Sequence, residues 1–136
     1  MNGKIVVPER HPDVWVNRLR PYMTDAVCTL TAAGLHVQHV WLDPSGPRDA
    51  TIRFGDTSAL VFDEVSGWRQ GVFVSGQQGE RTTLAEASYL GGGVLPDTSE
   101  LAYRLINCIS VARPAYRAVA DVRDGFEDAL RHRGGV

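Results

Sequence analysis

Alternating apolar and polar positions between residues 35 and 75 predict four β-strands in close succession. Each run is rich in Val, Ile, Leu, Phe or Trp and is bounded by turn-forming residues, as in strands of a half-buried sheet. The short connections favour pairing of successive strands, so the pattern predicts a four-stranded antiparallel meander. The predicted strands are Leu35 to Asp43, Ala50 to Phe54, Ala59 to Glu64 and Trp68 to Ser75.

The last two runs form the clearest β-hairpin in the chain. They flank the three-residue loop 65–67, which ends in a Gly that adopts positive φ without steric cost. This register places Glu64 opposite Trp68 and Asp63 opposite Arg69, and such a cross-strand ion pair contributes roughly 0.2–1 kcal/mol. One face then carries Leu60, Phe62, Trp68, Val72 and Val74, and the other carries Val61, Asp63, Arg69, Gly71 and Phe73.

Helical spacing of apolar residues precedes and follows these strands. Pro21 either kinks the first helical segment or begins a second helix within it. Capping-box patterns begin two later helices, at Thr83 and Asp97. Cys28 and Cys108 fall on apolar stripes and are expected to be buried, reduced thiols. The predicted helices cover residues 11–34, 83–90, 97–113 and 115–132.

These elements predict an α+β fold in a single domain over residues 1–136. A four-stranded antiparallel meander is flanked by an N-terminal helical segment and two or three C-terminal helices, which cover one face of the sheet. The second face carries Val61 and Phe73 among Asp63 and Arg69. Such a face is solvated, covered by a terminal segment, or buried in a partner.

Two stretches of the chain resemble a known domain family. The sequence LVFDEVSGWR, from Leu60 to Arg69, is similar to the LVWDE-x-x-GWR stretch of an actinobacterial, Streptomyces-type domain family of unknown function, although Phe62 stands where that family has Trp. The sequence YLGGGVLPDTSELA, from Tyr89 to Ala102, resembles that family's second recurring stretch. The resemblance implies an α+β domain and no particular activity.

Composition and charge narrow the classes of partner. The net charge of −2 and the pI near 6.0 give no basic surface for nucleic acid or anionic membrane. No apolar stretch is long enough to span a bilayer, and the N-terminus lacks the apolar segment of a signal peptide. We therefore expect a cytoplasmic protein without a membrane partner.

The sequence contains no motif with an established catalytic or metal-binding mechanism. His36 and His39 would point to opposite faces of a strand and so could not share one ion. Asp63 and Glu64 are adjacent on a strand and also face opposite sides, so they are not a proton-sharing pair. We expect no catalytic residue, metal or cofactor.

These observations favour a non-enzymatic protein-interaction or accessory module, with a homodimer as its most common form. The predicted partner-binding residues are Asp63, Glu64, Trp68 and Arg69 at the hairpin tip and Phe73 on the second sheet face. An alternative is a small-ligand-binding domain or small enzyme, with a pocket between sheet and helices lined by His39, Trp41 and Tyr103. Nucleic-acid binding is a weaker alternative, because acidic residues balance the arginines of the C-terminal segment.

Overall fold

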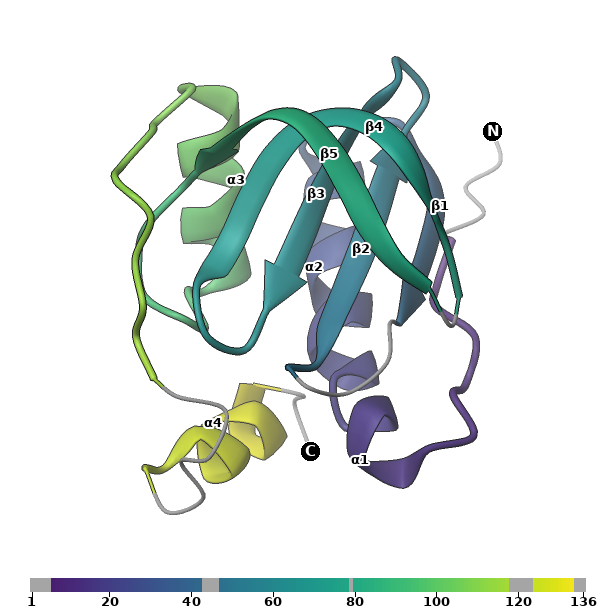
Figure 1. Cartoon of the computed structure of the whole chain (residues 1–136), viewed down its shortest axis with the longest axis vertical. Coiled ribbons are helices and arrows are strands. Elements are labelled where there is room, and N and C mark those ends of the chain that lie inside the picture. The colour runs from purple at the N-terminus through teal and green to yellow at the C-terminus, as the bar shows by residue number, and fades with distance from the viewer. Residues whose placement is uncertain (1–5, 43–46, 79, 118–123, 134–136) are drawn as a thin grey trace.

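A computed structural model describes residues 6–42, 47–78, 80–117 and 124–133 of the chain. It has an α+β fold, in which a five-stranded antiparallel sheet follows the sequence order β1-β2-β3-β4-β5 (Figure 1). The sequence predicted the meander correctly but one strand too few. The elements are α1 (Val14–Asn17), α2 (Arg20–Ala32), β1 (Val37–Leu42), β2 (Asp49–Phe54), β3 (Ser58–Asp63), β4 (Gly67–Gln77), β5 (Glu80–Tyr89), α3 (Thr98–Ile106) and α4 (Phe126–Arg133).

The main core lies between α2 and one face of the sheet. Tyr22 of α2 packs against Phe62 of β3 and Trp68 of β4, with ring centroids 5.7 and 6.1 Å away. The Tyr22 hydroxyl donates to the carbonyl oxygen of Pro96 at 2.7 Å. Pro21 lies in the first turn of this second helix rather than kinking a longer one. The helical stripe that faces the sheet comprises Tyr22, Met23, Ala26, Val27 and Leu30, all without exposed surface.

The β3–β4 hairpin has a different register from the predicted one. Phe62 pairs with Trp68, and Asp63 pairs with Gly67, so the loop is residues 64–66. The Asp63 carboxylate causes this difference, because its Oδ1 accepts hydrogen bonds from the backbone N–H groups of residues 65 and 66 and closes the turn one residue earlier. The partner of Trp68 is thus Phe62 instead of Glu64, a change of two residues. Because side chains alternate between the faces with a period of two, Leu60, Phe62 and Trp68 still share the face that packs against α2.

Residues 80–89 form strand β5, where the capping-box pattern predicted a helix over residues 83–90. The helix prediction is wrong because β5 pairs with β4 along its length, from Gln77 opposite Glu80 to Arg69 opposite Tyr89. Long-range pairing of this kind outweighs a local helix-start pattern. The β4–β5 hairpin bends at several register shifts, and β5 crosses in front of β2 and β3 (Figure 1).

The bent hairpin covers the second face of the sheet. Thr82 of β5 hydrogen-bonds to Thr51 of β2, with 2.6 Å between the hydroxyl oxygens. Thr51 and Val61 consequently have no exposed surface. The chain itself therefore covers the face whose environment the sequence left open. Val72 and Val74, which were expected beneath the helices, are instead 42% and 57% exposed, because Val72 pairs with Ser58, the first residue of β3, and Val74 lies beyond it.

The C-terminal third departs from the predicted helices. Helix α3 ends at Ile106, well before the predicted end at residue 113, and Cys108 lies exposed beyond it. The expectation of a buried Cys108 is therefore wrong, whereas Cys28 on α2 is half-buried. Residues 115–117 are not helical, and residues 118–123 lie outside the described part of the chain. Of the predicted helix over residues 115–132, α4 confirms the last part.

Candidate functional site

The residues predicted to form an exposed hairpin tip are mostly buried. Trp68 has no exposed surface, and its Nε1 donates to the Tyr22 hydroxyl at 3.2 Å. The predicted ion pair between Asp63 and Arg69 is present, with 3.0 Å between Oδ2 and Nη1. Glu64 was expected to be exposed beside Trp68, and this is wrong: it is 2% exposed, because the turn directs it toward two buried arginines.

The other residues singled out in the sequence do not meet in a common pocket. Phe73 is half-buried on the second sheet face, where its ring lies edge-on to Trp41 at 5.9 Å and under the guanidinium of Arg53 at 4.0 Å. His39 is exposed on β1, and Tyr103 is exposed on α3. Helix α3 packs beside α2, whereas Trp41 lies against Phe73 on the second sheet face. The structure therefore separates Tyr103 from His39 and Trp41, which lie two residues apart on β1.

Glu64 lies at the centre of a buried group of charges. Its Oε1 accepts hydrogen bonds from Nη2 of Arg48 at 2.9 Å and from Nη1 of Arg117 at 2.7 Å. Its Oε2 accepts from Nε of Arg48 at 3.1 Å and from the Arg48 backbone N–H. The Arg48 side chain is fully buried, and that of Arg117 is 5% exposed. One turn carboxylate thus joins the start of β2 to the segment that follows α3.

The same arginines hold helix α4. Glu127 of α4 accepts a hydrogen bond from Nη2 of Arg48, and Asp124 accepts one from Nε of Arg117 at 2.6 Å. The Phe126 ring lies under both guanidinium groups, 4.2 Å from that of Arg117 and 5.5 Å from that of Arg48. We call Arg48, Glu64, Arg117, Asp124 and Glu127 the ion cluster.

Helix α1 contacts the ion cluster through Trp15. The guanidinium of Arg48 lies 4.0 Å from the centre of the indole ring, and its Nη1 donates to the Trp15 carbonyl oxygen at 3.1 Å. The carboxylate of Asp13 begins this helix by accepting hydrogen bonds from the backbone N–H groups of residues 15 and 16. A helix of four residues is not stable alone, so its position depends on these tertiary contacts.

Hydrogen bonding keeps the ion cluster charged. Burial opposes ionisation of Glu64, but the hydrogen bonds from Arg48 and Arg117 outweigh it and hold the pKa of this carboxyl below its ordinary value. Burial likewise opposes charge on Arg48, but its two carboxylate partners outweigh it and raise its pKa. The hydrogen bond from Arg117 lowers the pKa of Asp124. Both oxygens of Glu64 are already occupied, so the ion cluster is suited to fastening elements together rather than to transferring protons.

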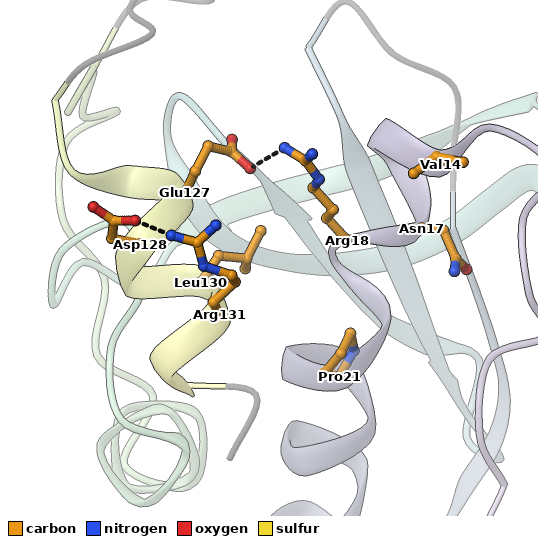
Figure 2. Close-up of a pocket in the computed structure, with 8 residues that line it drawn as sticks. All are labelled: Val14, Asn17, Arg18, Pro21, Glu127, Asp128, Leu130 and Arg131. Atoms are coloured by element: carbon orange, nitrogen blue, oxygen red, sulfur yellow. Dashed lines mark hydrogen bonds and ion pairs between the residues drawn. The ribbon is translucent and has the colours of Figure 1, made fainter. Parts of the chain in front are cut away.

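A groove of about 660 Å³ opens beside the ion cluster, between α4 and the α1–α2 segment (Figure 2). Val14, Pro21 and Leu130 give it apolar walls. Glu127 reaches across it to Arg18, with 3.4 Å between Oε1 and Nη1. Glu127 therefore belongs both to the ion cluster and to the rim of the groove. The other charged residues on the rim are Asp128 and Arg131, which pair with each other on α4.

Comparisons with protein-family models, with curated proteins and with solved structures give no match. The resemblance of the hairpin to an actinobacterial domain family therefore stays a prediction. Within the described ranges, no helix is long and apolar enough to cross a membrane. In the same part of the chain, no three His, Cys, Asp or Glu side chains are grouped so that they could hold a metal ion.

The sequence analysis missed the ion cluster and the groove. Arg48 and Glu64 are 16 residues apart, and Arg117 is 53 residues from Glu64, so no local spacing connects them. Glu64 stood out in the sequence, but as part of an exposed tip. One feature of the sequence could have indicated the ion cluster. Glu64 directly follows β3 and Arg48 directly precedes β2, and antiparallel pairing of these two adjacent strands brings the two residues together.

Proposed function

We propose that the protein is a non-enzymatic interaction module that self-associates through the groove between α1–α2 and α4. Two copies related by a two-fold axis would each place α1 and α4 against the same surface of the other. The single observation that carries this proposal is Val14, which is 75% exposed at the edge of an apolar groove. An exposed apolar side chain beside an apolar groove is complementary to a second copy of itself.

The charges around the groove also support a second copy as the partner. The rim carries two arginines and two carboxylates, so its formal charges cancel. In a two-fold arrangement, an arginine from one copy meets a carboxylate from the other, and this favours a defined orientation. A strongly basic or acidic partner would gain little from such a rim. The four residues are Arg18, Glu127, Asp128 and Arg131.

The ion cluster holds the groove in shape before any partner binds. Arg48 contacts Trp15 of α1 and Glu127 of α4, and residues of these two helices line opposite walls of the groove. A surface that is ordered in advance loses less conformational entropy on association. This arrangement favours the groove over the bent β4 strand as the docking surface, although both expose valine.

The test is the solution mass of a matched pair of variants, measured by size-exclusion chromatography with light scattering across a concentration series. The wild-type chain is expected to be a dimer, and Val14→Glu is expected to be a folded monomer, because a carboxylate would be buried without a partner. Val74→Glu is the control, since Val74 is similarly exposed but lies on β4. A monomeric wild-type chain, or a dimer that Val74→Glu disrupts and Val14→Glu leaves intact, would refute the proposal.

A further inference from the structure

A second cavity, of about 350 Å³, lies on the opposite face of the sheet from α2 and shares no lining residue with the groove. It lies where β2 and β4 begin and β3 ends, and residues from both ends of β5 line it. Tyr89, the last residue of β5, fixes its outer wall, because its carbonyl oxygen accepts a hydrogen bond from the backbone N–H of Val111 at 2.8 Å. That contact holds the following segment, including Arg113, against the cavity.

Three arginines and two carboxylates line this cavity, which leaves a formal charge of +1 when both carboxylates are ionised. The carboxylates are engaged within the chain. Asp63 accepts hydrogen bonds from its own turn and from Arg69. Asp49, on a side chain that is 4% exposed, pairs with Arg81.

Arg113 is the cation whose charge is not matched in this way. Its guanidinium lies 6.0 Å from the centre of the Tyr89 ring, and no hydrogen bond or ion pair joins it to another residue in the described part of the chain. Arg69 also lines the cavity, so its guanidinium is a second one beside that of Arg113, and its Nη1 donates a hydrogen bond to Asp63. Guanidinium groups bind carboxylate, phosphate and sulfate groups through paired, charge-assisted hydrogen bonds.

We propose that this cavity binds a small oxyanion, a molecule with a phosphate, sulfate or carboxylate group, between Arg113 and Arg69. The aromatic face of Tyr89 then forms one side of the site, and the Asp49–Arg81 pair forms the other. This ligand site is independent of the self-association proposed above.

Protonation of Asp49 is expected to make anion binding at this site depend on pH. Burial raises the pKa of the Asp49 carboxyl to about 6, against the opposing effect of Arg81. The other charged groups that act on it are Arg69 of β4 and Asp63 of β3. Below pH 6 the protonated carboxyl no longer repels an anion, so binding is expected to be tighter there than above pH 6.

The experiment is a sodium sulfate titration followed by heteronuclear NMR, with sodium chloride at matched ionic strength as the reference. Sulfate keeps its charge across this pH range, so a change of affinity reports on the protein. We expect saturable shifts at Tyr89 and Arg113, and at least about tenfold weaker binding for Arg113→Gln. Arg10→Gln, an exposed arginine outside the cavity, is the control and is expected to bind as the wild type does.

Inorganic phosphate and acetate are then titrated in the same way, and tighter binding of one assigns the site to tetrahedral or to planar anions. If sulfate shifts are no different from those with chloride, or if Arg113→Gln binds sulfate like the wild type, the proposal is wrong. Affinity that does not fall above pH 6 would place the anion away from Asp49 and would also overturn it.

Discussion

Glu64→Gln is the sharpest test of the ion cluster, because it keeps the shape of the side chain and removes its charge. The carboxylate accepts hydrogen bonds from the backbone N–H, Nε and Nη2 of Arg48 and from Nη1 of Arg117. A glutamine offers one acceptor oxygen and turns an N–H₂ group toward a guanidinium. The substitution therefore breaks hydrogen bonds and leaves positive charge buried without its partner.

The expected loss is large because the partners are buried. The side chains of Arg48 and Glu64 are 0% and 3% exposed, so water cannot replace the lost contacts. Breaking a buried ion pair by removing one partner costs about 3–5 kcal/mol. Domains of ordinary stability unfold with a free energy of about 5–15 kcal/mol, so Glu64→Gln is expected to remove a substantial part of it.

Urea unfolding followed by tryptophan fluorescence measures this loss, with Glu100→Gln as the matched control. Glu100 pairs with Arg104 along α3 but is 46% exposed, and such helical surface pairs contribute about 0.3–0.5 kcal/mol. The free energy of unfolding of the wild type should also fall as pH drops below the ordinary glutamate pKa of about 4.3, since the folded-state pKa of Glu64 is depressed. A loss for Glu64→Gln no larger than that for Glu100→Gln would refute the reasoning.

Two further variants test other buried polar groups, each by the free energy of unfolding. Tyr22→Phe removes the hydroxyl that accepts from Trp68 and donates to Pro96, and is expected to cost about 1–3 kcal/mol; no loss would show that these contacts are dispensable. Asp49→Asn tests the raised pKa of Asp49, which is about 6 in the folded state. Because the folded state binds this proton more tightly than the unfolded state does, the free energy of unfolding of the wild type should fall by about 2–3 kcal/mol as the pH rises from 4 to 6. The variant should lack this decrease, and an unchanged pH profile would contradict the assignment.

Local patterns predicted the parts of the fold that depend on neighbours in sequence. The stripe of α2 from Tyr22 to Leu30 and a β-hairpin between the runs 59–64 and 68–75 follow from apolar spacing and turn chemistry, and both elements are present. The register was wrong because it depended on the side chain of Asp63, which closes the turn through its own hydrogen bonds. A spacing rule for loop lengths does not include that contact.

The parts that failed depend on residues far apart in the chain. Strand β5 contains a capping-box pattern, yet pairing with β4 decides its conformation. Its position over β2 then buries the second sheet face, which made Phe73 a packing residue rather than an exposed one. The sequence had left open whether this face is solvated, covered or buried in a partner, and no property of residues 59–75 alone indicates that β5 covers it.

The ion cluster is expected to affect both the stability of the fold and the proposed self-association, and Glu64→Gln and Val14→Glu distinguish the two effects. Helices α1 and α4 are too short to hold their positions alone, and both contact Arg48, whose buried charge is compensated by Glu64. Glu64→Gln should therefore both lower the free energy of unfolding and weaken the proposed dimer, because it releases both walls of the groove. Val14→Glu should weaken the dimer alone, because Val14 is exposed and contributes little to the core. Loss of stability in Val14→Glu as large as in Glu64→Gln would mean that α1 is part of the core rather than a docking surface.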